Sequence, residues 1–348
     1  MKEKALDNKC PNCLGLITFD IKKQLWHCEY CDSEFKLEEL NKRSLNASSL
    51  ENNKVRDTMD VDEYTCKSCG AKVIADENTA STFCVYCGNA AILKNKLTGI
   101  YAPDYIIPFK NTKEEIIINF KNLQKGRPLM PKLFNDPKNI EKISGIYIPF
   151  WLFDINIKGK AEFRGLKISS WRSGDYRYTK TDTYNLIREA DISFDRIPVD
   201  GSSRFDNDLM QSLEPFEYEK FEKYNHAYLA GFLAEKYDVS DSETQESALT
   251  RSVNSTINEM KDTCSGFSSV SLSNESFNKQ IKETDYVLLP VWMLNVKYGE
   301  KFYTFAMNGQ TGKMVGNIPV HKGKAVLMWI LVFAITFIVL TIGWVVFK

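Results

Sequence analysis

The segment CPNCLGLITFDIKKQLWHCEYC, residues 10–31, carries two Cys-x-x-Cys pairs that are separated by 14 residues. The segment CKSCGAKVIADENTASTFCVYC, residues 66–87, repeats this spacing, and each of its cysteines lies 56 residues after its counterpart. Tyr30 and Tyr86 keep the same offset. A constant offset without gaps indicates an internal duplication of one structural unit.

This spacing is typical of a closed site built from four thiolates. A Cys-x-x-Cys turn directs two sulfurs at one point, and two such turns on neighbouring hairpins complete a tetrahedral four-sulfur site, the usual structural zinc geometry. Four thiolates leave no open coordination position, so we predict two zinc ions that stabilise folding and do not catalyse a reaction. The eight predicted ligands are Cys10, Cys13, Cys28, Cys31, Cys66, Cys69, Cys84 and Cys87.

Disulfides, redox chemistry and iron binding are the alternative uses of these cysteines. Disulfides are disfavoured by the cytoplasmic location predicted below. Redox activity of a Cys-x-x-Cys pair normally needs a thioredoxin-like βαβ context, which the sequence does not show. Iron stays open, because ligand type alone does not exclude it. His27 adjoins Cys28, but Phe83 stands at the duplicate position, so His27 is predicted to be an aromatic neighbour of the site. The ninth cysteine, Cys264, is predicted to be buried near a helix end.

Residues 325–347 read AVLMWILVFAITFIVLTIGWVVF and contain no charged residue. At about 1.5 Å per residue this run spans about 34 Å, which exceeds the roughly 30 Å core of a bilayer. A buried helix of a soluble core would normally be shorter and show a polar stripe, so we predict a transmembrane helix. Three lysines precede it and one follows it, namely Lys313, Lys322, Lys324 and Lys348.

The lysine asymmetry predicts that the N-terminal bulk of the chain, residues 1–324, is cytoplasmic. The first residues, MKEKALDNKCPNC, contain no apolar run that resembles a signal peptide. We therefore expect a tail-anchored, single-pass protein whose large soluble part faces the cytosol, which in bacteria means the inner face of the plasma membrane.

The overall charge is balanced, with 45 Lys and Arg against 45 Asp and Glu among 348 residues. The balance holds inside the cysteine repeats, where residues 9–36 carry four Lys and four acidic residues, and residues 65–94 carry three and two. A phosphate-binding face normally needs a cluster of positive charge, so nucleic acid is not an expected partner. Hydrophobic residues make up 43% of the chain, which excludes wholesale disorder.

The region between the repeats and the membrane segment shows both helix and strand patterns. Thr112 with Glu115, and Ser240 with Glu243, form capping-box patterns that predict a helix ending near Gly126 and another over 241–262. Aromatic and β-branched residues predict strands over Gly145–Ile157, Lys160–Ser169, Tyr176–Arg188, Ala190–Ile197, Ser268–Leu272, Tyr286–Tyr298 and Lys301–Ala306.

Two of these strand segments resemble each other. IPFWLFDI at 148–155 aligns with LPVWMLNV at 289–296, an offset of 141. We interpret them as two related hairpins that pair in one sheet, each followed by a return near Gly159 or Gly299. Chance similarity of aromatic strands is the alternative.

These features predict an α+β fold with two N-terminal zinc ribbons of four cysteines each, a mixed and mainly antiparallel α+β domain, and one C-terminal transmembrane helix. The expected parts are zinc ribbon 1 at 8–37, a polar linker at 38–63, zinc ribbon 2 at 64–97, the cytosolic α+β domain at 98–318 and the transmembrane helix at 325–347.

The order of motifs resembles the bacterial membrane-anchored proteins with TFIIB-type double zinc ribbons, the YdjG-like family. The motifs are the double Cys-x-x-Cys ribbon, GIYIPFWLFD, EPFEYEKFEKYNHAYLAGFLAEKYD, YVLLPVWMLNVKYGEKFYTFAMNGQTGKMVG and the terminal apolar run. This resemblance implies a role beside PspA-type and SPFH-domain proteins in a phage-shock or envelope-stress complex at the membrane.

The leading functional hypothesis is a non-enzymatic, membrane-tethered scaffold that presents protein-binding surfaces on the cytosolic face. The first alternative is a nucleic-acid or transcription-associated ribbon protein held at the membrane. The second is an enzyme with a site in residues 98–318, but the sequence offers no set of nucleophile, base and orienting group there, and no small-molecule substrate is evident.

Overall fold

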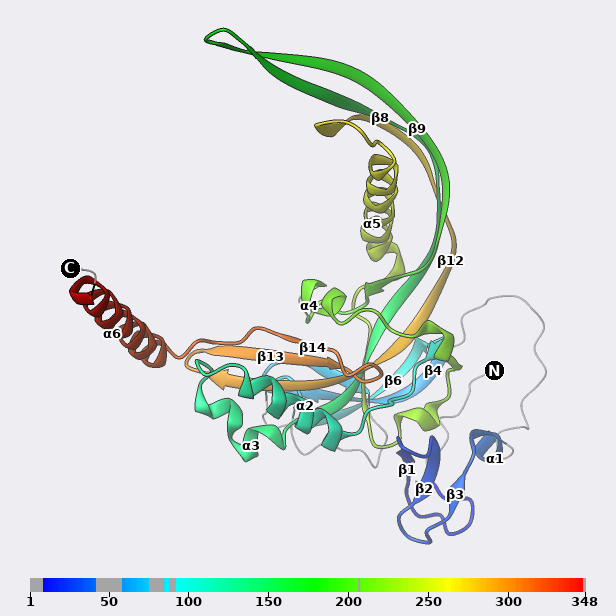
Figure 1. Cartoon of the computed structure of the whole chain (residues 1–348). Helices are drawn as coiled ribbons and strands as arrows, with labels where there is room; N and C mark the ends of the chain where they lie inside the picture. Colours follow the sequence, from blue (N-terminus) through cyan, green and yellow to red (C-terminus); the bar gives the residue numbers. More distant parts are fainter. Residues whose placement is uncertain (1–8, 42–57, 75–83, 88–91, 206, 347–348) are drawn as a thin grey trace.

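The computed structural model of the chain describes residues 9–41, 58–74, 84–87, 92–205 and 207–346. Figure 1 shows a small N-terminal sheet, a large twisted sheet flanked by helices, a long curved arm that rises from this sheet, and a helix that projects away from the body. Pairing between the described strands is antiparallel except at two places. There β11, Leu233–Glu235, meets β8, Ser144–Ser173, and β7, Tyr105–Ile106, meets β12, Ser269–Tyr298. The predicted α+β class and its mainly antiparallel sheet are confirmed.

The first cysteine repeat forms a separate three-stranded sheet. Its strands pair in the order β1-β2-β3 and a short helix follows: β1 Ile17–Asp20, β2 Leu25–Cys28, β3 Glu34–Phe35 and α1 Leu37–Asn41. Trp26 on β2 is buried, and its indole N–H donates to the carbonyl of Ala227 at 2.8 Å. Trp26 and Phe19 also pack their rings against Tyr228, at centroid distances of 5.0 and 5.5 Å. These contacts attach the small sheet to the body.

The second cysteine repeat is built into the large sheet. The sheet runs β10-β7-β12-β8-β11-β5-β4-β6, with the remaining strands branching from β8 and β12. The strands near the second repeat are β4 Thr58–Cys66, β5 Lys72–Ile74, β6 Ile92–Tyr101 and β11 Leu233–Glu235. The ribbon strand β5 pairs with β4 on one side and with β11 on the other, so ribbon and body share hydrogen-bond ladders. The predicted end of zinc ribbon 2, residue 97, falls inside β6. Most of the predicted linker at 38–63, namely residues 42–57, lies outside the described residues.

Three long strands form the arm: β8 Ser144–Ser173, β9 Tyr176–Asp200 and β12 Ser269–Tyr298. The strand β8 lies between the other two and pairs antiparallel with both. Helix α5, Asp241–Asp262, lies inside the curve of the arm (Figure 1) and packs Met260 against Ala161 and Phe163 of β8. Cys264, just after α5, is buried in this cluster as predicted.

The two related segments pair with each other, as the internal similarity predicts. Leu289 lies opposite Ile148 in the β8–β12 ladder. Alternate residues of both strands are buried on opposite faces of the sheet, which places the two strands at the centre of the core. The indole N–H groups of Trp151 and Trp292 donate to backbone carbonyls at 2.9 and 3.0 Å.

The hairpin return predicted at Gly299 is present, but the return predicted at Gly159 is wrong. The backbone at Gly299 turns with φ 66° between β12 and β13. At Gly159, β8 continues without a turn, and Gly159 lies opposite Phe277 in the ladder with β12. An added Cβ there would lie 2.1 Å from the Ser276 carbonyl oxygen on β12. The glycine thus permits close approach of two strands, and β8 turns only after Ser173, with Gly174 at φ 63°.

Helices lie on both faces of the large sheet, since α2, Lys113–Lys125, packs into one buried cluster and the short helix at 207–212 packs into the other. Helix α2 begins at the predicted capping box, where the Thr112 N–H donates to Glu115 Oε2 at 2.8 Å. The capping box at Ser240 also forms at the start of α5. The remaining elements are β7 Tyr105–Ile106, η1 Lys132–Asn135, α3 Pro137–Ile140, α4 Asn207–Ser212, η2 Tyr218–Lys220, β10 Glu222–Lys223, η3 His226–Leu229, β13 Lys301–Asn308, β14 Met314–Gly316 and α6 Lys322–Val346.

Candidate metal centres

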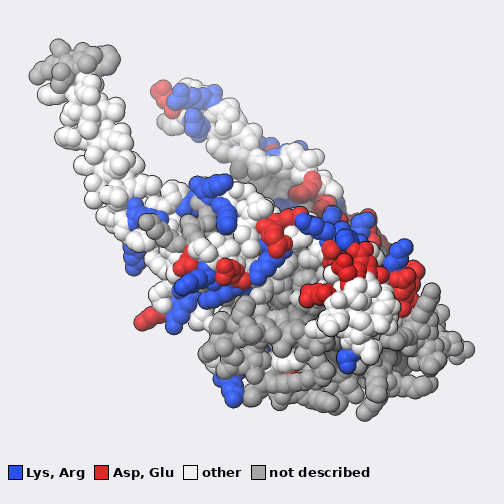
Figure 2. Space-filling model, turned by 90° about the horizontal axis from the view of Figure 1, so that it is seen from below, with Lys and Arg blue, Asp and Glu red and all other residues white. Residues whose placement is uncertain are grey.

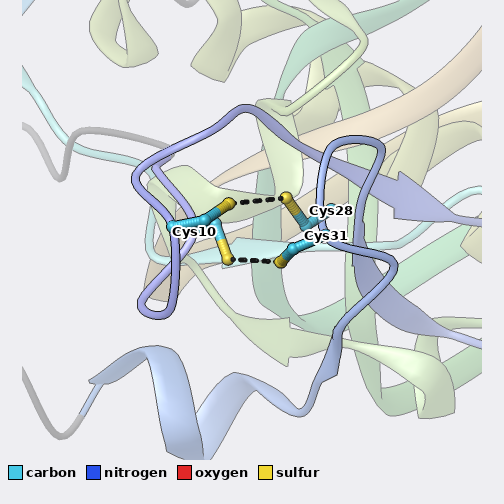
Figure 3. Close-up of side chains that lie close together, drawn as sticks. Cys10, Cys28 and Cys31 are labelled. Atoms are coloured by element: carbon cyan, nitrogen blue, oxygen red, sulfur yellow. Dashed lines mark hydrogen bonds between the residues drawn. The ribbon is translucent and has the colours of Figure 1, made fainter.

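The first cysteine pair of each repeat lies in a tight turn closed by backbone hydrogen bonds. The Cys10 N–H donates to the Gly15 carbonyl at 2.7 Å, and the Leu14 N–H donates to the Cys10 carbonyl at 3.0 Å. The second pair repeats the turn, with the Cys28 N–H donating to the Ser33 carbonyl at 2.9 Å. These turns leave both sulfurs of a pair on the same side, facing the other turn (Figure 3).

The sulfur positions of the first cluster fit a tetrahedral metal site. All four Sγ atoms lie within 4.8 Å of one another. The Cys10–Cys31 and Cys13–Cys28 sulfurs are 3.5 and 3.6 Å apart. Metal–sulfur bonds of about 2.3 Å in a tetrahedron place sulfurs about 3.8 Å apart. The four thiols therefore match the ligand set of one ion with little rearrangement.

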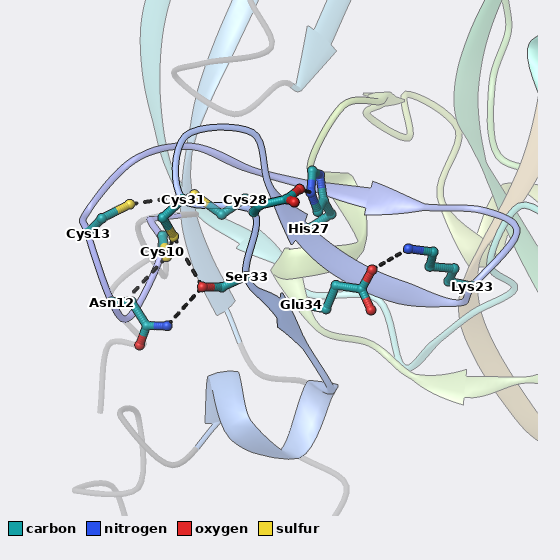
Figure 4. Close-up of polar contacts among 10 residues, drawn as sticks. Cys10, Asn12, Cys13, Lys23, His27, Cys28, Cys31, Ser33 and Glu34 are labelled. Atoms are coloured by element: carbon teal, nitrogen blue, oxygen red, sulfur yellow. Dashed lines mark hydrogen bonds and ion pairs between the residues drawn. The ribbon is translucent and has the colours of Figure 1, made fainter.

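Polar groups around the first cluster favour the thiolate form of Cys31, whereas the pKa of Cys13 is raised to about 12. The N–H groups of Asn12 and Gly15 donate to the sulfurs of Cys10 and Cys13 at 3.3 and 3.4 Å. The Cys31 Sγ lies 3.2 Å from the Ser33 hydroxyl (Figure 4), and hydrogen bonding to Ser33 lowers the pKa of Cys31 to about 6. A thiolate at neutral pH is the form that binds a metal.

His27 does not join the cluster. Its Nε2 lies 2.7 Å from Asp32 Oδ1 (Figure 4), and the ring is not part of the four-sulfur group. This agrees with the prediction that His27 is a neighbour of the site and not a ligand.

The second cluster has the same geometry. Its Cys66–Cys87 and Cys69–Cys84 sulfurs are both 3.7 Å apart, and all four lie within 4.8 Å of one another. The Cys66 N–H donates to the Ala71 carbonyl at 2.8 Å, which reproduces the first repeat 56 residues later. The structure thus brings the eight predicted ligands together in two groups of four, each of which can hold a metal ion.

Helix α6 is long and apolar enough to cross a membrane. The most apolar 18 residues within Lys322–Trp344 have a mean hydropathy of 2.8, and none of them is buried against the described part of the chain. Its start is tied to the body, because the His321 N–H donates to the Leu129 carbonyl and the Lys324 ammonium donates to the Met130 carbonyl, both at 2.8 Å. These features agree with single-pass anchoring.

Comparison with known proteins adds one relative. The uncharacterized protein YdjG from Bacillus subtilis (strain 168) is 35% identical to this chain over 316 residues, which is 91% of each protein. The chain belongs to the YdjG family. No family model matches the sequence, and no solved structure matches it. The resemblance predicted from the motifs is confirmed at this level, and any activity of this YdjG-family chain must be argued from its geometry.

The second metal centre of this YdjG-family chain is held by side chains of the body, which the sequence did not reveal. The Arg204 Nη2 donates to the Gly70 carbonyl at 2.8 Å in the first cysteine turn. The Asn295 amide donates to the Val85 carbonyl at 2.8 Å in the second turn. Neither residue belongs to a recognisable sequence motif, because each lies more than 100 residues along the chain from the turn that it contacts in the fold.

Buried carboxylates lie beneath this second centre. Glu235 is 1% exposed and accepts a hydrogen bond from the Ser202 hydroxyl at 2.9 Å, with Arg204 Nε 3.6 Å away. Asp200 accepts from the Ser202 N–H at 3.0 Å. Burial raises the pKa of Asp200 to about 8 and that of Glu235 to about 7. One oxygen of each carboxyl has no hydrogen-bond partner among the described residues, so its burial is not offset there and favours the neutral form.

Proposed function

We propose that this chain is a non-enzymatic, zinc-stabilised scaffold that is tethered to the bacterial plasma membrane and faces the cytosol. The observation that carries the proposal is the pair of closed four-thiol clusters. One cluster lies in the separate small sheet and the other is built into the large sheet, and the same chain continues into the exposed apolar helix α6. Closed clusters support a structural role, since they offer no coordination position to a substrate.

Zinc is the proposed metal at both centres. The test is elemental analysis of the full chain purified in detergent from cells grown with both zinc and iron. We expect two equivalents of zinc per chain, and one equivalent after Cys28→Ser or Cys84→Ser. Iron in place of zinc, with the visible absorption of an iron–thiolate centre, would refute the choice of metal.

The proposed orientation rests on the lysines before α6. Protease treatment of inverted and right-side-out membrane vesicles distinguishes the two orientations. We expect the ribbons and the large sheet to be digested only in inverted vesicles, where the cytosolic face is exposed.

The proposed partners are PspA-type and SPFH-domain proteins, which the family resemblance implies. Affinity capture of the full chain from solubilised membranes, followed by mass spectrometry, tests this. We expect a PspA-type or SPFH-domain protein to be captured by the full chain, and a variant lacking 322–348 serves as the matched control for membrane placement. Recovery of neither class in several detergents would refute the proposed partners.

A further inference from the structure

The β8–β9 hairpin extends beyond the third strand of the arm. The strand β12 pairs with β8 no further than Leu166, whereas β8 and β9 pair out to Ser173 and Tyr176. We call this two-stranded extension, residues 167–182, the arm tip. All of its side chains from 167 to 181 are exposed. The tip therefore has no core of its own, and its side chains are available to a partner.

Three aromatic side chains lie on one face of the arm tip. Trp171 is 51% exposed and stacks on its cross-strand partner Tyr178, with ring centroids 5.8 Å apart and planes at 14°. Tyr176, two residues before Tyr178, points to the same face and is 72% exposed. Trp and Tyr are the side chains that favour the interface between water and lipid, because they combine an apolar ring with a polar group.

Two arginines lie on the opposite face. Arg172 and Arg177 are directly opposed in the β8–β9 ladder. Like charges at opposed positions destabilise a hairpin. Neither guanidinium has an ion-pair partner among the described residues, whereas Lys180 of the same tip pairs with Asp182. The tip as a whole carries four Lys or Arg and two Asp. An anionic surface would attract both guanidinium groups and so offset the repulsion between them.

The arm tip and α6 extend from the same side of the body. Figure 1 shows the arm curving back toward the side from which α6 projects, and Figure 2 shows both extending in the same direction, with basic side chains at the end of the arm. Because α6 is tied to the body at its first residues, a membrane crossed by α6 lies on the side to which the tip points.

We propose that the arm tip binds the anionic surface of the bilayer that α6 crosses. The end of the hairpin would enter the headgroup layer edge-on, so that Arg172 and Arg177 on one face contact acidic headgroups while the three aromatic rings on the other face insert at the same level. The proposal rests on the membrane anchoring proposed above, and it adds a second, charge-dependent contact to the single span. Such a contact becomes weaker as salt rises, because the attraction is screened.

The test is hydrogen exchange of the full chain in lipid nanodiscs, which resolves the tip from the rest of the arm. Nanodiscs of phosphatidylcholine alone are compared with nanodiscs containing phosphatidylglycerol. We expect the amides of 167–182 to exchange more slowly in the anionic discs, with protection that falls at high salt. The Arg172→Gln/Arg177→Gln variant should lose about fivefold in protection per arginine removed.

The matched control is Lys160→Gln/Lys279→Gln, which removes the same charge from exposed positions lower on the arm. It should leave protection of the tip unchanged. Three results would overturn the proposal. The tip could exchange equally in both kinds of disc, the two double variants could lose protection equally, or protection of the tip could depend on protein concentration and not on lipid charge. A chain that does not enter nanodiscs at all would overturn the proposed anchoring as well.

Discussion

The cysteine turns show that one backbone angle has a different energetic cost for different residue types. Leu14 and Gly70 are duplicate positions, and both adopt the left-handed conformation, with φ of 62° and 69°. Leucine is strained there by about 1–2 kcal/mol, whereas glycine is not. The duplication thus supplied the same turn twice, and only the second copy carries the residue that suits it. A left-handed residue is also expected after the last cysteine of each repeat, at Asp32 and Gly88. Asp32 adopts it with φ of 59°, and Gly88 lies outside the described residues.

This difference predicts opposite effects of two substitutions. Gly70→Ala should destabilise the second centre by about 1 kcal/mol, because an added Cβ meets no atom within 4 Å and only the backbone angle is unfavourable. Leu14→Asn should stabilise the first centre, since Leu14 is 63% exposed and asparagine tolerates this angle. The rate of metal transfer to a chelator measures both effects. Gly126→Ala, at a glycine without positive φ, is the control and should leave the rate unchanged.

The buried carboxyl groups predict how stability changes with pH. Burial raises the pKa of Asp200 to about 8 and of Glu235 to about 7, whereas both would have a pKa of about 4 in the unfolded chain. The folded chain therefore holds protons that the unfolded chain releases. This contribution to stability is fully present below about pH 4 and is lost as pH rises from there through 7 and 8.

The measurement is the melting temperature of the metal-loaded chain in detergent at pH values from near neutral to mildly alkaline. We expect it to fall as pH rises, and the fall to be smaller in Asp200→Asn. A variant that follows the same pH profile as the natural sequence would show that Asp200 ionises normally. This site leaves no pattern in the sequence, because Asp200 and Glu235 look like ordinary polar residues until the sheet brings both beside Ser202.

At the level of elements, the sequence predicts helices well and long strands poorly. The start of α5 follows from Ser240 and Glu243, because a capping box is a local signal. The strand β12 was predicted only at its two ends, since its middle, SNESFNKQIKETD at 273–285, is polar and mostly exposed. That stretch is a strand because β8 pairs with it, and this partner is more than 100 residues away.

Gly159 gives a direct test of the arm. Gly159→Ala should destabilise the chain by about 1–3 kcal/mol, because its Cβ would lie 2.1 Å from the Ser276 carbonyl oxygen and would force β8 and β12 apart. Gly174→Ala is the control, since its Cβ meets nothing within 4 Å and only the turn angle, φ 63°, is unfavourable. Chemical denaturation in detergent compares the two variants. Equal destabilisation would mean that the arm tolerates a wider strand spacing at Gly159.

At the level of the whole molecule, the two metal centres are joined to the body in different ways. The first sheet is attached by side chains such as Trp26, whereas the second shares ladders with the large sheet through β5 and β11. The sequence predicts both clusters from spacing alone. It does not predict this difference, because the β5–β11 pairing joins residues that are far apart in the sequence, Ile74 and Ala234.

This difference predicts that loss of one metal disturbs the body more than loss of the other. In Cys66→Ser, hydrogen exchange of β11 should become faster, because the β4–β5 hairpin loses the cluster that closes it. In Cys10→Ser, β11 should keep its protection. Comparable acceleration in the two variants would show that the body depends equally on both centres. Metal content measured on the same samples confirms that each variant has lost one ion.

The pairing of β8 with β12 also governs the order in which the chain folds. The β8–β9 hairpin closes through Gly174 and can form as soon as both strands are synthesised. The other edge of β8, from Ser144 to Leu166, must wait for β12, whose partners there run from Met293 to Ser269. Until then the nascent polypeptide exposes a long unpaired strand edge, the state in which β proteins aggregate most readily. We therefore expect this sheet to form more slowly than the helices.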